Sequence, residues 1–151
     1  MPLRVAIASD HGGFELKQEI LKQLVELGVI YEDFGSFTSV AVDYPDYAFT
    51  VGTKVASGEF DRGILICGTG VGISIAANKV KGVRCALVHD VFTAKATRQH
   101  NDSNVLAMGG RVIGGELAKM IVTTWLEEAF IGAHHTGRIE KIADYEVNTD
   151  V

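Results

Sequence analysis

The sequence predicts an α/β fold in which helices cover both faces of a five-stranded parallel sheet. Short apolar runs alternate five times with segments of helical periodicity, and this alternation is typical of parallel strands joined by helices. The run at residues 63–66 is wholly apolar, as in a strand that is covered on both faces. With 151 residues, 47% of them hydrophobic, the chain has the size of one domain with a buried core. We therefore expect a single domain over residues 1–151.

The first half of the chain supplies three strands. The first strand is predicted over the mainly apolar residues 3–8. An amphipathic helix follows and is stopped by Gly28, because glycine commonly occupies the position just after the last helical turn. The second strand is predicted over residues 29–34. A helix over about 46–57 then leads to the third strand at residues 63–66.

The second half supplies two strands, at residues 84–89 and 104–108, and four helices. The helices are predicted over residues 71–78, 91–99, 116–130 and 138–147. Those over 71–78 and 116–130 are apolar or small on nearly every side, and one face of a sheet cannot cover such a surface. A homodimer is the simplest arrangement that would bury these helices.

Composition excludes several classes of protein. The net charge of −5 gives no general attraction to nucleic acids or to an anionic membrane, and no apolar stretch is long enough to span a bilayer. Cys67 and Cys85 are the two cysteines, and no signal peptide is recognisable, so we expect a reduced, cytoplasmic protein. Cys85 lies within a predicted strand and is interpreted as a small buried residue. The five histidines lack the spacing of metal ligands, so we expect no metal site.

A candidate site follows the strand at residues 63–66. Cys67 ends this strand, and Gly68, Gly70 and Gly72 then let the backbone turn tightly and approach a ligand. The next helix starts inside the loop, so its unpaired N–H groups face the same point. Cys67 alone could be a buried structural thiol, but this setting favours the thiolate. The thiolate could act as a nucleophile or as a base.

The glycine loop does not match the common nucleotide-binding motifs. The dinucleotide motif requires G-x-G-x-x-G, whereas here the glycines stand at every second position, from Gly68 to Gly72. Asp90 does fall about twenty residues further on, where an acidic residue would bind ribose. The Walker motif is absent, because no Gly-Lys-Ser/Thr follows the loop. We expect no nucleotide cofactor.

Other polar groups follow strands and should lie at the same edge of the sheet as Cys67, where such folds bind ligands. They are Asp10 and His11, then His89 and Asp90, then the turn at residues 109–111. His11 could cap the first helix or bind an anion. His89 and Asp90 are interpreted as the start of a helix.

His100 and Asn101 do not follow this rule. They stand after a helix and before a strand, so we expect them at the opposite edge of the sheet, out of reach of Cys67 in the same chain. They are either a structural turn or part of a neighbouring subunit's site.

Five motifs occur in order along the chain. They are Ser9-Asp10-His11, Asp43-Tyr44-Pro45, Cys67-Gly68-Thr69-Gly70-Val71-Gly72-Ile73-Ser74, Arg98-Gln99-His100-Asn101-Asp102 and Gly110-Arg111-Val112. Together they closely resemble the sugar-phosphate isomerase family that includes type B ribose-5-phosphate isomerases and galactose-6-phosphate isomerase subunits, over nearly the whole chain. The resemblance implies a Rossmann-like fold, no metal or cofactor, and a dimer or tetramer with shared sites. It also implies that the helix at about 138–147 packs on the partner subunit.

The resemblance implies an aldose–ketose isomerisation, most simply of ribose 5-phosphate and ribulose 5-phosphate, through an enediolate. Cys67 would be the base, with Thr69 and Ser74 near it, and His100 of the partner subunit, with Asn101 beside it, would open the sugar ring. The negative oxygen would be held by N–H groups of the loop residues Gly68, Thr69, Gly70, Val71 and Gly72. Losing one such donor typically raises a barrier by about 3–4 kcal/mol.

The resemblance also implies how the substrate is held. Asp10 would bind sugar hydroxyls, and His11, Arg111 and Arg138 would bind the phosphate. The family often has a second arginine four residues before the last of these, where this chain has His134. Histidine is only partly charged at neutral pH and lacks the bidentate fork of arginine.

The departure at His134 keeps a hexose 6-phosphate, of allose or galactose, open as the substrate. A non-catalytic protein that binds sugar phosphates is a further alternative. The presence of both Cys67 and His100 argues against that alternative, because binding alone requires neither.

Overall fold

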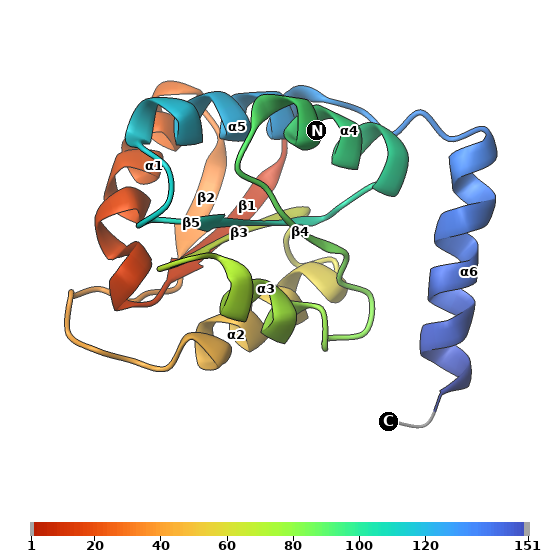
Figure 1. Ribbon diagram of the computed structural model, residues 1–151, viewed down its shortest axis with the longest axis horizontal. Coiled ribbons are helices and arrows are strands. Elements are labelled where there is room, and N and C mark those ends of the chain that lie inside the picture. Colours follow the sequence, from red (N-terminus) through yellow and green to blue (C-terminus); the bar gives the residue numbers. More distant parts are fainter. Residues whose placement is uncertain (1, 150–151) are drawn as a thin grey trace.

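The computed structural model describes residues 2–149 and confirms the predicted α/β fold (Figure 1). The strands are β1 (Arg4–Ser9), β2 (Ile30–Asp33), β3 (Arg62–Cys67), β4 (Cys85–Leu87) and β5 (Val105–Gly109). They form one five-stranded sheet in the order β2-β1-β3-β5-β4, and every neighbouring pair is parallel. β4 is an edge strand and covers only half of the predicted residues 84–89.

Helices cover both faces of this sheet, as predicted. They are α1 (Phe14–Glu26), α2 (Tyr44–Ala56), α3 (Val71–Ala77), α4 (Val91–Asn101), α5 (Gly115–Glu127) and α6 (His134–Asn148), with a short 3-10 turn, η1 (His11–Gly13). Figure 1 shows α1, α4 and α5 on one side of the sheet and α2 and α3 on the other. α6 stands apart from both layers.

The core has two halves because successive side chains of a strand point to opposite faces. Ile7, Ile64 and Met108 pack against α1, α4 and α5, whereas Leu65 and Cys67 pack against α2 and α3. Burying one large aliphatic side chain contributes about 1.5–3 kcal/mol. The three central strands are therefore the most firmly held part of the molecule, and the site residues follow directly after them.

The strand register brings the carboxyl ends of the central strands to one edge. Ser9 of β1 pairs with Ile66 of β3, and Cys67 pairs with Gly109 of β5. The segments that begin at Asp10, after Cys67 and at Gly109 consequently leave the sheet side by side, as the sequence predicts.

The last two helices differ from the prediction. α5 ends at Glu127 instead of about residue 130, because Glu128 is extended and its carbonyl accepts a hydrogen bond from Arg98. α6 begins at His134, four residues earlier than predicted, and none of its residues is buried. Its far end is tied to the body where Gly82 N–H donates to Glu146 Oε1, at 2.8 Å.

None of the helices within residues 2–149 combines the length and the apolar character that crossing a membrane requires.

Candidate active site

Cys67 is the last residue of β3 and is only 5% exposed. The Gly70 N–H donates to its Sγ, at 3.1 Å, and a backbone donor aimed at the sulfur stabilises negative charge there. Gly70 has a φ of 79°, and a Cβ on it would lie 2.8 Å from the carbonyl carbon of Met108. Only glycine fits this position, so the tight turn that delivers the N–H to the thiol depends on it.

The segment after β1 packs directly onto the loop after Cys67. The Asp10 N–H donates to the carbonyl of Ile66 at 3.2 Å, and a Cβ on Gly12 would lie 2.9 Å from the nitrogen of Gly68. Asp10 is buried, and its Oδ1 accepts the Gly13 N–H at 3.1 Å, so Asp10 caps η1. The structure thus places Asp10 beside the loop and assigns the capping role to it, not to His11.

His11 is half-buried at the same edge of the sheet. Its Nδ1 accepts the N–H of Val42, at 3.2 Å. In the neutral ring this acceptor role puts the proton on Nε2, so Nε2–H is a donor that can meet an anion. The same bond anchors the loop before α2 to the site.

The turn after β5 is joined to the loop after Cys67 by two backbone hydrogen bonds. Gly110 N–H donates to the carbonyl of Cys67 at 2.8 Å, and Arg111 N–H donates to that of Gly68 at 3.0 Å. The Arg111 guanidinium lies across Gly68, where a Cβ would be 3.2 Å from Nη1. An exposed cation therefore stands at the mouth of the loop, as predicted.

His89 and Asp90 both have structural roles, but only Asp90 has the predicted one at the start of a helix. His89 Nε2 accepts the Gly109 N–H at 2.9 Å, so its ring supports the turn after β5. Burial holds the pKa of His89 below its usual value, against the opposing pull of Asp90. Asp90 caps α4 by accepting the N–H of Thr93, at 2.7 Å.

The hydroxyls of Thr69 and Ser74 both form hydrogen bonds with the backbone of Val71. Thr69 Oγ1 accepts the Val71 N–H at 3.2 Å, and the buried Ser74 donates its hydroxyl to the Val71 carbonyl at 2.7 Å. The N–H groups of Gly70 and Val71 thus already donate within the loop, and a bound anion would share or replace these bonds.

Two residues without a predicted role also belong to this edge. A Cβ on Gly72 would lie 2.8 Å from the hydroxyl of Tyr44, so the first residue of α2 borders the loop. The motif at residues 43–45 pointed to this segment without giving Tyr44 a task. Ser9 is fully buried, and its hydroxyl has no hydrogen-bond partner within the described residues. The motif at residues 9–11 begins with this serine without giving it a task.

We call this group the Cys67 site; it comprises Asp10, His11, Tyr44, residues 67–72 and Arg111. Ser74 of α3 borders this site through its bond to the Val71 carbonyl. The structure does not bring the other predicted site residues, His100, Asn101, His134 and Arg138, to it. His100 and Asn101 form the last turn of α4 and so belong to a helix, not to the turn after it. The Asn101 carbonyl accepts a hydrogen bond from Arg84, the residue before β4, at 3.1 Å. These two residues therefore lie at the amino edge of the sheet, opposite Cys67.

A second group of site residues gathers at this opposite edge. The His100 and His135 rings are stacked, with centroids 4.3 Å apart and planes 13° apart. The ring centroids of His134 and His135 are 4.0 Å apart, and the ring planes are inclined by 39°. Arg138 follows on the next turn of α6. We call these four residues, with Asn101, the histidine cluster. The pKa of His135 is held below its usual value. Partial burial is the largest cause, and the positive charges of His134, His100 and Arg138 lower it further.

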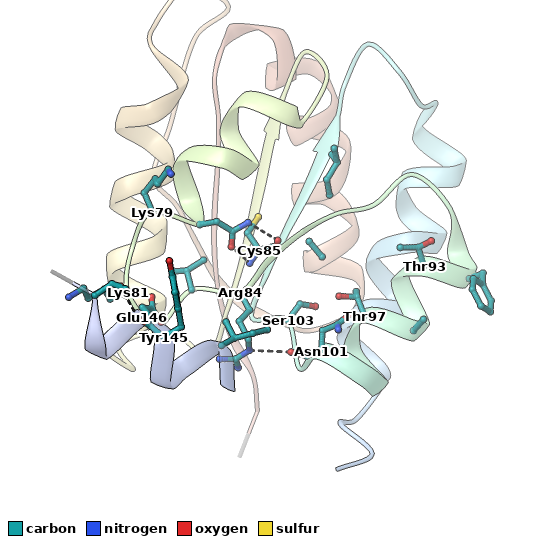
Figure 2. A pocket seen from close by; sticks show the side chains of 18 residues that line it. Lys79, Lys81, Arg84, Cys85, Thr93, Thr97, Asn101, Ser103, Tyr145 and Glu146 are labelled. Atoms are coloured by element: carbon teal, nitrogen blue, oxygen red, sulfur yellow. Dashed lines mark hydrogen bonds between the residues drawn. The ribbon is translucent and has the colours of Figure 1, made fainter. Parts of the chain in front are cut away.

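A groove of about 1000 Å³ separates α6 from the body of the protein (Figure 2). Figure 2 shows Tyr145 and Glu146 of α6 on its wall, together with Thr97 and Asn101 of α4. The groove follows β4 as far as Leu87, whose Cδ1 would lie 2.6 Å from a Cβ on Gly70. It therefore extends from the histidine cluster to the edge of the Cys67 site.

Cys85 lies on this groove, half-buried within β4. Burial raises the pKa of its thiol to about 12, which fits the structural role predicted for it. Within residues 2–149, no three histidine, cysteine, aspartate or glutamate side chains are grouped so that they could hold a metal ion.

Known proteins match this chain over nearly its whole length. The model of the Ribose/Galactose Isomerase family matches residues 5–142. The chain is 61% identical to the putative sugar phosphate isomerase YwlF of Bacillus subtilis, over 95% of this chain and 97% of that protein. It is 53% identical to ribose-5-phosphate isomerase B of Escherichia coli, over 95% of this chain and 96% of that protein.

Solved structures match equally well. Ribose-5-phosphate isomerase B of Clostridium thermocellum has a TM-score of 0.95 and 50% identity, covering 96% of this chain and 98% of that chain. Ribose-5-phosphate isomerase B of Mycoplasma genitalium with bound ribulose-5-phosphate has a TM-score of 0.94 and 44% identity, covering 99% of both chains.

Proposed function

Since this chain belongs to the ribose/galactose isomerase family, we propose that it interconverts ribose 5-phosphate and ribulose 5-phosphate. The observation that carries the proposal is the Cys67 site: a thiol at a strand end with a backbone N–H on its sulfur. Full-length similarity to a structure that holds ribulose-5-phosphate supports the choice of sugar. The reaction requires an aldose–ketose isomerase, a class of intramolecular oxidoreductase.

The chemical step moves a proton between C2 of the aldose and C1 of the ketose. Cys67 as thiolate removes the C2 proton, and the electron pair left on C2 forms the C1–C2 double bond while the C1 carbonyl oxygen becomes the negative oxygen of an enediolate. The O2 hydroxyl proton then passes to O1, and the Cys67 thiol returns its proton to C1, which leaves the ketone at C2. The N–H groups of the loop at residues 68–72 stabilise the negative oxygen. Thr69 holds the loop in shape through its bond to Val71 N–H.

Ribose 5-phosphate is mainly a closed ring, so the ring must open before C2 becomes acidic. Opening breaks the bond between C1 and the ring oxygen, which gains a proton while the C1 hydroxyl loses one. We assign this proton transfer to His100, with Asn101 beside it to bind a sugar hydroxyl. Both belong to the partner subunit, because within one chain they lie at the edge of the sheet opposite Cys67.

A phosphate dianion would lie where the two subunits meet. His11 and Arg111 of one subunit contribute a donor and a cation, and His134 and Arg138 of the other contribute further positive charge. Asp10 lies deeper, beside the Gly68 backbone, and its second carboxylate oxygen is suited to a sugar hydroxyl.

The dimer that this arrangement requires is supported by the groove beside α6. Large apolar side chains that line it are exposed in the single chain: Leu87, Phe92, Ile142 and Tyr145. Phe92 alone is 81% exposed. A second copy of the chain seated in this groove would cover them and bring each histidine cluster to the other subunit's Cys67 site. We place the enzyme in the cytoplasm, where its two free cysteines stay reduced.

Turnover by the purified protein tests the proposal directly. We expect conversion of ribose 5-phosphate to ribulose 5-phosphate without added metal or cofactor, followed by NMR of the sugar carbons. Binding of ribose 5-phosphate with no conversion and no exchange of the C2 proton would instead indicate a sugar-phosphate-binding protein.

A hexose 6-phosphate is the second candidate substrate, because His134 stands where the family often has arginine. The test compares kcat/KM for ribose 5-phosphate with kcat/KM for the 6-phosphates of allose and galactose. A larger value for a hexose would change the substrate while leaving the reaction type intact.

A further inference from the structure

His135 has no part in the reaction described above, yet its ring is the close neighbour of His100. The two rings come from different helices, α4 and α6, and lie nearly parallel with centroids 4.3 Å apart. His100 is exposed and His135 is half-buried. An exposed imidazole on the last turn of a helix has several accessible rotamers, and a stacked ring removes most of that freedom.

The stack rests on a firm attachment of the segment before α6 to the end of α4. The Ile131 N–H donates to the Gln99 carbonyl at 3.1 Å. Gln99 Nε2 donates to Glu128 Oε2 at 2.9 Å, and Arg98 Nε donates to the Glu128 carbonyl at 3.2 Å. Three hydrogen bonds thus connect residues 128–131 to the two residues that precede His100. The first turn of α6 is therefore placed by these hydrogen bonds and not by the stack alone.

The charges around His135 favour its neutral form. His100 faces it from α4, and His134 and Arg138 face it from α6. Glu128, the carboxylate on the segment between α5 and α6, accepts a hydrogen bond from Gln99. A neutral ring can lie against His100 without repelling the proton that His100 transfers.

We propose that His135 is a positioning residue that holds the imidazole of His100 in one orientation by ring stacking. The inference rests on the proposed role of His100 in opening the sugar ring. Positioning errors of about 1 Å can cost a catalytic group about 10²-fold in rate, so a supporting ring has a measurable effect.

The stack itself is tested by NMR, without reference to activity. The His100 ring signal is identified by its loss in His100→Asn. We expect its ring-current shift to disappear in His135→Ala, to persist in His135→Phe, and to be unchanged in Thr136→Ala, an exposed control on the same turn. An unchanged His100 signal in His135→Ala would overturn the stack.

The effect on catalysis is tested with two reactions of the same sugars. Isomerisation of cyclic ribose 5-phosphate needs ring opening. Deuterium exchange at C1 of ribulose 5-phosphate does not, because this ketose is acyclic when its 5-hydroxyl carries the phosphate. We expect His135→Ala to lower kcat for isomerisation about tenfold with KM and exchange unchanged, and His135→Phe to restore kcat.

Two kinetic results would overturn the inference: a parallel fall of isomerisation and exchange in His135→Ala, or a His135→Phe variant no better than His135→Ala. Failure of the proposed function is distinguishable, since wild-type protein would then not isomerise either sugar while the NMR comparison would still report on the stack.

Discussion

The Cys67 site and the histidine cluster are built in different ways. The first is made of strand ends and glycine turns joined by backbone hydrogen bonds, such as that from Gly110 N–H to the Cys67 carbonyl. The second is made of side chains on the ends of two helices, and one of these helices, α6, buries none of its residues.

This difference corresponds to two tasks of an isomerase. Proton abstraction and oxyanion binding depend on distances of a few tenths of an ångström, which a packed sheet can maintain. In the proposed dimer, ring opening and phosphate binding use groups that reach across to the other subunit, which long side chains at the ends of α4 and α6 can supply. Substitutions in the Cys67 site should therefore abolish proton abstraction. Substitutions in the histidine cluster should abolish the ring opening and phosphate binding that we propose it provides to the partner subunit.

The largest effect is expected from Cys67 itself. Cys67→Ala should lower kcat by about 10²–10⁴-fold or more, because the proton at C2 loses its base. The fold should remain, since a buried cysteine replaced by alanine leaves only a small cavity; circular dichroism and the melting temperature check this. A normal kcat in a folded Cys67→Ala protein would remove the thiol from the mechanism.

A mixed dimer tests whether the two regions act in different subunits. Homodimers of Cys67→Ala and of His100→Asn should each lose turnover, the latter by about 10²–10⁴-fold. A heterodimer carrying one mutation in each chain has one site with both defects and one with neither, because the symmetry pairs unlike regions. We expect such a purified heterodimer to recover about half of the wild-type rate, whereas sites within single chains would leave it inactive.

Glycine substitutions compare the backbone requirements of the two regions. Gly70→Ala should cost about 1–2 kcal/mol from its left-handed backbone alone, and more from the approach to Met108. We expect a lower melting temperature and a large loss of kcat. Gly137→Ala in α6 is the matched control: a Cβ there meets nothing within 4 Å, so the melting temperature should not fall. A harmless Gly70→Ala would show that the loop is less constrained than its geometry indicates.

The smallest effect concerns pH. The folded pKa of His89 lies below its usual value because of burial. Its contribution to stability is therefore complete above the unfolded pKa of about 6.5 and is lost as pH falls toward the folded pKa, where protonation breaks the bond from Gly109 N–H. His89→Gln, which keeps an acceptor, should flatten the stability–pH profile below about pH 6.5. His135→Ala should change this profile less, because within residues 2–149 the structure shows no backbone hydrogen bond to the His135 ring comparable to that from Gly109 to His89; the reverse order would contradict the assignment.

The Cys67 site could be predicted from the sequence because it follows from local rules. Parallel strands end at one edge, so Asp10, Cys67 and Arg111 had to meet there once the strands were recognised. The position of His100 after a helix also indicated correctly that it lies at the opposite edge. The roles of these residues came from the family resemblance, since spacing alone left Cys67 as either nucleophile or base.

The rest depended on tertiary contacts that leave no local pattern. The start of α6 was placed too late, because Gly132 and Ala133 both have positive φ and nothing before His134 signals a helix. The stack of His135 on His100 requires two helices to meet, and adjacent histidines in the sequence do not indicate this. Tyr44 borders the loop only because α2 packs beside α3.

The absence of any buried residue in α6 has a consequence for how this enzyme can change over evolutionary time. A substitution in the core or in the glycine loop must satisfy packing and function at once, whereas one on α6, none of whose residues is buried within the chain, is limited less by packing than by its function in the proposed dimer. The α6 residues proposed to bind the phosphate, His134 and Arg138, can therefore vary with little cost to the folding of the chain. His134, in place of the arginine common in the family, is such a change, and α6 is the part of the chain where new sugar specificities would arise first.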